Sequence, residues 1–196
     1  MGGEHLSSYE VIYEEDTPLY AQLHAGQFAV DEDLACAMYE ELIERASRAG
    51  FEQYEVANFA RPSFACRHNL NYWRAGSFHG LGPSATGYVR GARTKNWSNT
   101  RLYCELIEAG RPAVESREEL PPLARAGEAA AFGLRMVAGW PFDDFRRATG
   151  HDLRGEWAED MRHLVERGWG RLSPLQFQLT PAGLRFADAA AQLFLR

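Results

Sequence analysis

Apolar residues in the first third of the chain predict a strand, a long helix and a second strand. Residues 5–13 and 51–57 are rich in side chains that favour strands. Between them, apolar side chains recur at four-residue spacing from Leu34 to Ala46, which is typical of a helix with one apolar face. Carboxylates at residues 31–33 favour the helix N-terminus, and Gly50 favours its end. This order predicts a parallel βαβ unit with an unpaired sheet edge, through which chains could self-associate.

The middle and the end of the chain follow another pattern. Residues 88–97 predict a β-hairpin, and residues 99–108 predict a helix with Cys104 on its buried face. Helical segments come next, followed by a predicted two-stranded wing within residues 169–179 and a last helix that Thr180 caps. Helices followed by a wing and a further helix are typical of a winged-helix-like domain.

A domain boundary is predicted in the charged, extended stretch that follows residue 111. We therefore expect an α/β domain over residues 1–111 and a small, mainly helical, winged-helix-like domain over residues 112–196. A winged helix makes DNA binding a second class of function to consider. Acidic and basic side chains are balanced from Gly155 onward, however, whereas binding of phosphates requires a basic surface. No nucleic-acid partner is therefore predicted.

Composition and charge narrow the function classes further. The chain has 196 residues, 45% of them hydrophobic, and a net charge of −6, so it can bury a core but has no general attraction for nucleic acid or anionic lipid. It contains no apolar run long enough to span a membrane and no signal peptide. Its 3 cysteines are scattered and do not form a disulfide set. These features predict a cytoplasmic protein without a membrane span.

The stretch that least suits a core is Cys66–Trp73 (CRHNLNYW), an amide-rich turn followed by residues 78–85 (FHGLGPSA). The imidazole of His68 is a common type of ligand for a transition metal or haem iron, and the aromatic residues beside it offer flat apolar faces. Gly80 and Gly82 would allow the backbone to approach a ligand closely. A histidine in a loop commonly satisfies hydrogen bonds alone, so the spacing by itself leaves both interpretations open.

These motifs resemble the HemW haem chaperones, radical-SAM proteins related to the oxygen-independent coproporphyrinogen III oxidase HemN. The similarity runs over nearly the whole chain and is carried by residues 54–60 (YEVANFA), 66–73, 80–82 and 179–183. In that family the histidine of the His-Asn-x-x-Tyr-Trp signature is implicated in haem binding. The resemblance therefore implies haem binding by four residues, with the first as the candidate ligand of the haem iron: His68, Asn69, Tyr72 and Trp73.

Other residues are expected near the haem. Cys66 and His79 are the alternative iron ligands within reach of the signature. The resemblance also predicts that ligands meet the C-terminal ends of barrel strands. Glu55 and Asn58 are expected beside the cofactor on these grounds, and Gly80 and Gly82 because they allow the backbone to approach it.

The chain also departs from the family pattern. Radical-SAM relatives hold a [4Fe-4S] cluster with three closely spaced cysteines, whereas Cys36, Cys66 and Cys104 are far apart in the sequence. The glycine-rich segment expected for S-adenosylmethionine is also missing. The resemblance therefore implies the C-terminal half of such a protein: the last strands and helices of a partial (β/α)6 TIM-like barrel, followed by the winged-helix-like domain.

Three functions remain open from the sequence. The first is the C-terminal portion of a haem chaperone, which would bind haem and deliver it to unidentified haem-accepting proteins. The second is a portion of a coproporphyrinogen oxidase-like enzyme of porphyrin biosynthesis, and the third is a folded fragment without independent activity. The signature that contains His68 favours the chaperone. No catalytic residue is predicted, and no radical-SAM activity is expected of this chain alone.

Overall fold

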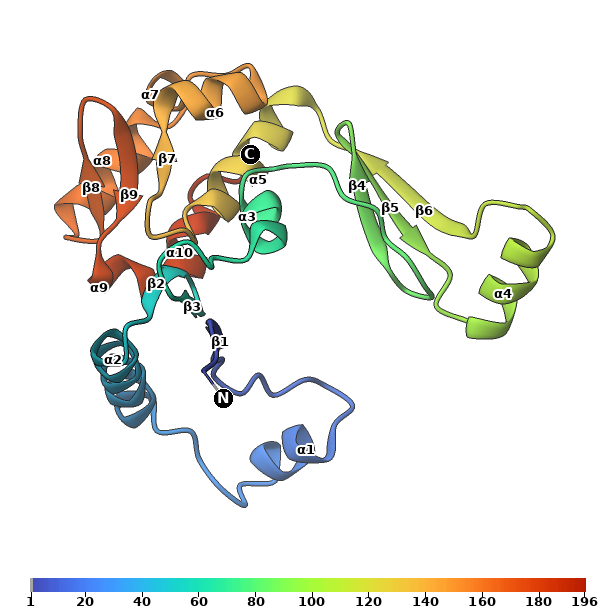
Figure 1. Cartoon of the computed structure of the whole chain (residues 1–196), viewed down its shortest axis with the longest axis horizontal. Coiled ribbons are helices and arrows are strands. Elements are labelled where there is room, and N and C mark those ends of the chain that lie inside the picture. Colours follow the sequence, from blue (N-terminus) through green and yellow to red (C-terminus); the bar gives the residue numbers. More distant parts are fainter. Residues whose placement is uncertain (1) are drawn as a thin grey trace. The chain divides into compact units, whose positions relative to one another are not determined.

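The computed structural model describes residues 2–196, which form two compact units. The N-terminal unit ends at Cys66, and the C-terminal unit spans Arg67–Arg196. Figure 1 shows the elements of both in chain order by colour. Among the described residues, no helix is at once long and apolar enough to cross a membrane.

The N-terminal unit contains a small antiparallel sheet. Its strands are β1 (His5–Ser7), β2 (Glu52–Glu55) and β3 (Asn58–Ala60), in the order β1-β3-β2. Both outer strands pair antiparallel with β3. The strands β1 and β2 therefore run in the same direction, as the predicted crossover requires, but they do not pair with each other, because the chain reverses after β2 and places β3 between them. The predicted first strand is also shorter than expected, since residues 8–13 follow it without regular structure.

Helix α2 is confirmed within this unit. It spans Glu32–Arg48 and follows the short helix α1 (Pro18–His24). The Asp31 side chain caps α2 by accepting a hydrogen bond from the Leu34 backbone N–H at 2.9 Å. The apolar stripe that predicted the helix is largely uncovered, since Leu34 is 55% exposed. Local signals thus fixed the helix even though little of its apolar face is buried.

The C-terminal unit begins with helix α3 (Arg67–Trp73), which contains the signature residues. The stretch read from the sequence as a turn is helical here. A second antiparallel sheet follows, with its strands in the order β4 (Thr86–Val89), β5 (Ala92–Asn96) and β6 (Val114–Glu119). Helix α4 (Thr100–Glu108) lies between β5 and β6 in the sequence. Figure 1 shows this sheet as an arm with α4 at its end.

The arm confirms the predicted hairpin and corrects one prediction about its helix. Strands β4 and β5 pair antiparallel, and β6 joins them from the stretch in which a domain boundary was predicted. Cys104 is exposed, contrary to the prediction of a buried thiol. The reason is that no residue of Thr100–Glu108 is buried, so the apolar side of α4 has no core to pack against.

The rest of the unit is mainly helical. It contains a third small antiparallel sheet, with its strands in the order β7 (Trp140–Pro141), β9 (Gln176–Leu179) and β8 (Gly170–Leu172). Two helical stretches are interrupted, the first at Trp157 and the last one, which Thr180 caps, at residues 185–186. The elements are α5 (Pro122–Gly133), β7 (Trp140–Pro141), α6 (Phe142–Thr149), α7 (Leu153–Glu156), α8 (Ala158–Glu166), β8 (Gly170–Leu172), β9 (Gln176–Leu179), α9 (Pro181–Leu184) and α10 (Ala187–Gln192).

Two buried tryptophans organise the core of these helices. The indole N–H of Trp140 donates to the Ala129 carbonyl at 2.9 Å, and that of Trp157 donates to the Phe194 carbonyl at 3.0 Å. Phe145 meets both rings edge-on, with centroid distances of 5.3 Å and 5.9 Å. Burial of these rings with their N–H groups satisfied gives the C-terminal helices a dense aromatic core.

Candidate functional site

Helix α3 presents its histidine to solvent. His68 is exposed, and its ring meets Tyr72 edge-on with the centroids 4.6 Å apart. Residues four apart lie on the same face of a helix, so the signature spacing accounts for this contact. Tyr72 in turn meets Phe78 at 4.2 Å. The imidazole therefore adjoins an aromatic cluster while its ring remains accessible.

Arg74 attaches the end of α3 to the core of the C-terminal helices. Its Nη1 donates to the Gly139 carbonyl at 2.9 Å, and its guanidinium lies over the Trp140 ring at 4.8 Å from the centroid. Burial lowers the pKa of Arg74, while the charge of Asp144 acts in the opposite direction. The guanidinium remains charged at neutral pH, so it holds the helix through both a hydrogen bond and a cation–π contact.

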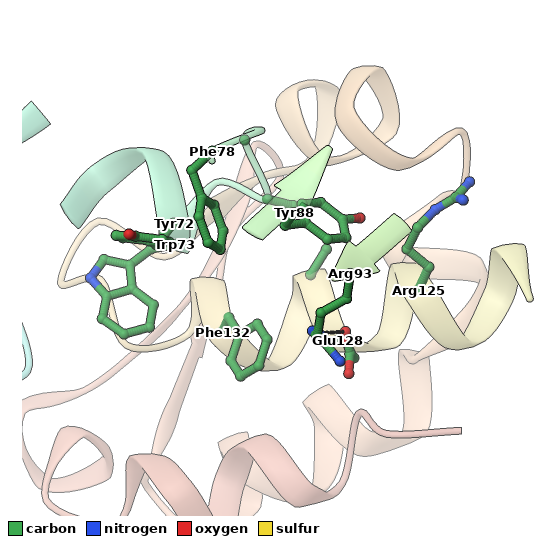
Figure 2. Close-up of a pocket in the computed structure, with 11 residues that line it drawn as sticks. Tyr72, Trp73, Phe78, Tyr88, Arg93, Arg125, Glu128 and Phe132 are labelled. Atoms are coloured by element: carbon green, nitrogen blue, oxygen red, sulfur yellow. Dashed lines mark hydrogen bonds and ion pairs between the residues drawn. The ribbon is translucent and has the colours of Figure 1, made fainter. Parts of the chain in front are cut away.

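An open cavity lies beside α3. Its volume is about 370 Å³, within the range of small-molecule sites of roughly 300–1,000 Å³. Figure 2 shows that α3, strands β4 and β5, and helix α5 all contribute side chains to it. Most of the large side chains around it are aromatic. The lining residues are Tyr72, Trp73, Ala75, Gly76, Phe78, Tyr88, Arg93, Arg125, Glu128, Ala129 and Phe132.

The charged lining residues differ in their partners. Arg93 pairs with Glu128 at 2.6 Å and with Glu118 at 2.8 Å. The hydrogen bond to Glu128 raises the pKa of Arg93. Within residues 2–196 no hydrogen bond or ion pair involves the Arg125 guanidinium. The cavity therefore has one neutralised ion pair and one cation without a partner.

Trp73 contributes the second aromatic wall from α3. Its indole Nε1 is buried and has no hydrogen-bond partner among residues 2–196. The Arg135 guanidinium lies 5.3 Å from the centroid of the ring. A buried indole N–H without a partner is uncommon, because it loses its bond to water without replacement.

The structure separates the four predicted haem-binding residues into two pairs. Tyr72 and Trp73 line the cavity, whereas His68 and Asn69 lie one turn earlier in α3 and do not line it. Contact between His68 and Tyr72 links the two pairs. The signature thus combines an accessible imidazole with one wall of an aromatic cavity.

The glycines expected beside a cofactor have packing roles in the structure. A Cβ on Gly80 would lie 2.6 Å from the backbone carbon of Thr86, so glycine allows the loop to contact β4. Gly82 has φ +104° and donates its N–H to the Tyr103 hydroxyl at 3.1 Å. Asn96 donates to the carbonyls of both glycines. Their proximity to a cofactor stays a prediction.

Glu55 and Asn58 lie in the N-terminal unit and are both buried. The Asn58 amide donates to a Glu55 carboxylate oxygen and, at 3.0 Å, to the Tyr9 hydroxyl. The Ser7 hydroxyl donates to the Asn58 carbonyl oxygen. These bonds give the two residues a role in joining β1, β2 and β3, and a role beside a cofactor stays a prediction for them as well.

The cysteines do not fit a cluster site. Cys36 lies on α2, Cys66 ends the N-terminal unit, and Cys104 lies on α4. Throughout residues 2–196, no group of three or more His, Cys, Asp or Glu side chains is placed to hold a metal ion. No reaction step through an iron–sulfur cluster or S-adenosylmethionine is assigned to this chain.

Several cavity residues were not found by sequence reasoning. Arg125, Glu128 and Phe132 lie on α5, which the sequence showed only as a helix rich in alanine, leucine and charged residues. They are three and four positions apart, so they share a helix face. An aromatic side chain and two opposite charges on one helix face are the signal that could have identified α5 as part of a binding site. Arg93 had no comparable signal, since its role depends on pairing across β5 and α5.

Comparison with known proteins identifies several that this chain is similar to. Residues 120–186 match the protein family described as the HemN C-terminal domain. Heme chaperone HemW from Mycobacterium tuberculosis (strain CDC 1551 / Oshkosh) is 36% identical over 141 residues, which cover 71% of this chain and 36% of the relative. Heme chaperone HemW from Bacillus subtilis (strain 168) is 30% identical over 197 residues, covering 100% of the chain and 52% of the relative.

A mitochondrial relative and a solved structure extend the comparison. Radical S-adenosyl methionine domain-containing protein 1 from Bos taurus is 32% identical over 200 residues, covering 95% of the chain and 45% of the relative. The structure of coproporphyrinogen III oxidase (HemN) from Escherichia coli, a radical SAM enzyme, matches with a TM-score of 0.73. That match covers 98% of this chain and 48% of HemN at 13% identity, so it shows a shared α/β fold.

The fold and these matches define the class that the chain resembles: the family of radical-SAM-related proteins that includes HemN and HemW. Within this family its sequence is similar to proteins named heme chaperone HemW. The chain spans about a third to a half of the length of these relatives. The region that it represents includes the HemN C-terminal domain.

Proposed function

We propose that the C-terminal unit is the haem-binding region of a HemW-like haem chaperone, which holds haem as cargo and passes it to acceptor proteins. The observation that carries the proposal is the geometry of α3. This helix exposes the His68 imidazole and places the adjoining Tyr72 ring in the wall of an aromatic cavity. An imidazole can ligate iron, while aromatic faces bury a flat apolar ring.

The residues present fit such a cargo. His68 is exposed on a helix whose end Arg74 fixes, so the ligand would be available without rearrangement of the helix. Tyr72 and Trp73 are proposed to cover the macrocycle, and Asn69 to orient the imidazole. His79 is exposed and is the alternative iron ligand in the same unit. Release to an acceptor suits a site that remains open to solvent.

We also propose how the two domains relate to the family fold. Residues 1–111 would correspond to the end of the partial (β/α)6 barrel, and residues 112–196 to the winged-helix-like domain. The likeness to the HemN fold supports the first part. The succession of helix α5, strand β7, helices α6 to α8 and hairpin β8–β9 supports the second. Self-association through the edge strand β1 remains part of this proposal.

Titration with haemin, followed at the Soret band, tests the proposed function. His68→Ala should weaken binding by about tenfold or more, equivalent to roughly 1.4 kcal/mol. His24→Ala is a matched control, because His24 is also exposed on a helix and meets Tyr20 at a centroid distance of 4.2 Å. Equal affinities and spectra for the wild type and His68→Ala would refute the proposal.

A further inference from the structure

The cavity beside α3 has an uneven distribution of polar groups. Aromatic side chains from α3, the following loop, β4 and α5 form most of its surface. Aromatic walls offer water few hydrogen bonds, so an apolar occupant that covers them is favoured by the removal of apolar surface from water. Since most of the large lining side chains are flat rings, the shape and chemistry favour a flat apolar body over a compact polar one.

Arg125 determines the sign of the charge at this cavity. Glu128 is already paired with Arg93, which also binds Glu118 outside the cavity. Arg125 has neither an ion pair nor a side-chain hydrogen bond within the described part of the chain. The cavity therefore offers a free cation, and a bound molecule with a negative group would satisfy it.

The position of Arg125 is fixed by the turn between β4 and β5. A Cβ placed on Gly91 would lie 2.4 Å from Arg125 Nη1, so the guanidinium rests against the bare backbone of this turn. Figure 2 shows the Arg125 side chain extending away from the aromatic rings. An anionic group that reaches it would lie at the rim, where water can still hydrate it, while the apolar body stays between the rings.

We infer that this cavity binds a flat, apolar molecule that carries a carboxylate, with the aromatic residues holding its body and Arg125 binding the carboxylate. Arg is suited to this role because its fork of N–H donors matches a carboxylate in two hydrogen bonds. The inference rests on the proposed function in one respect: haem has carboxylate side chains on a flat ring and belongs to this class. It goes further in assigning the carboxylate to Arg125 and in requiring no iron.

Binding of metal-free protoporphyrin IX and of its dimethyl ester distinguishes the role of Arg125 from the role of the aromatic side chains. The acid carries carboxylates, the ester does not, and neither contains iron for His68 to ligate. Fluorescence titration should show that Arg125→Gln weakens binding of the acid by about tenfold or more and changes binding of the ester little. Arg125→Lys should restore part of the loss. Arg162→Gln, an exposed arginine on α8 outside the cavity, should bind both probes as the wild type does.

A change in the aromatic wall should act on both probes. Phe132 is 45% exposed, so Phe132→Ser removes a ring from the cavity with little cost to the core, and both the acid and the ester should bind more weakly. Circular dichroism of each variant checks that the helices are intact. Equal binding of the acid by wild type and folded Arg125→Gln would overturn the assignment of the carboxylate.

The failure of this inference can be distinguished from failure of the proposed function. If the wild type binds haemin through His68 but does not bind protoporphyrin IX, the inferred cavity site is wrong and the haem-binding function stands. If it binds protoporphyrin IX through Arg125 while haemin affinity is independent of His68, the inferred site stands and iron ligation by His68 is wrong. Binding of neither molecule would overturn both.

Discussion

Replacing Arg74 with methionine should loosen the signature helix from the C-terminal core. The substitution keeps the apolar stem but removes a charged donor that bonds the buried Gly139 carbonyl and stacks over Trp140. A hydrogen bond from a charged donor contributes about 1.5–3 kcal/mol, and a cation–π contact about 0.5–2 kcal/mol. Because Arg74 is half-buried, rehydration of the guanidinium on unfolding offsets part of this sum. We expect the free energy of unfolding to fall by about 2 kcal/mol.

Urea denaturation followed by tryptophan fluorescence measures this change. Arg67→Met is the control, because Arg67 begins the same helix but is exposed. The two units can unfold in separate steps, so the transition of the C-terminal unit is the one to compare. Haemin affinity should fall less than in His68→Ala, because no ligand contact is lost. Equal urea midpoints for Arg74→Met and the wild type would refute the claim that Arg74 stabilises the contact between α3 and the C-terminal core.

Other predictions concern the core, a cap and the cysteines. Gly133→Ala would place a methyl group 1.8 Å from the Trp140 indole nitrogen, so we expect a loss of about 2 kcal/mol in urea denaturation. Gly155→Ala is the control, because the atom nearest to its added methyl group is 3.9 Å away. Since alanine favours a helix more than glycine does, the free energy of unfolding should stay unchanged or rise by up to about 1 kcal/mol. Asp152→Ala removes the cap of α7 and should cost about 1 kcal/mol at neutral pH. Burial acts to raise the pKa of Asp152, but hydrogen bonds from two arginines lower it overall, so this cost should vanish as the pH falls through the folded-state pKa. A Gly133→Ala variant as stable as the wild type, or an Asp152→Ala cost that persists in acid, would contradict these assignments. Anaerobic incubation with iron and sulfide should give no [4Fe-4S] chromophore, and a stoichiometric cluster would show that the cysteines can meet after all.

The parts of the fold that the sequence predicted depend on local signals. Asp31 and Gly50 flank α2 as the capping pattern requires, and the β4–β5 hairpin follows from strand-forming runs around Gly91. The order of strands in the N-terminal sheet had no such signal, since a reversal of the chain after Glu55 decides it. The burial of Cys104 was predicted from helix periodicity, which cannot show whether another element covers the helix.

The candidate site likewise contains residues that local sequence signals predicted and residues that they did not. Tyr72 and Trp73 were predicted from the signature, and both line the cavity. Its other walls come from α5 and β5, so Arg93 and Arg125 enter the site through tertiary contacts that spacing along the chain does not reveal. Arg74 immediately follows the signature, yet its role depends on the Gly139 carbonyl, 65 positions away.

Electron paramagnetic resonance of the ferric haem complex, at one equivalent of haemin, tests the central claim most directly. The account predicts a signal from imidazole-ligated iron in the wild type and in His24→Ala. In His68→Ala that signal should be lost or replaced by the signal of a different ligand set. Identical spectra for the wild type and His68→Ala would contradict ligation by His68 and, with it, the proposed haem site on α3.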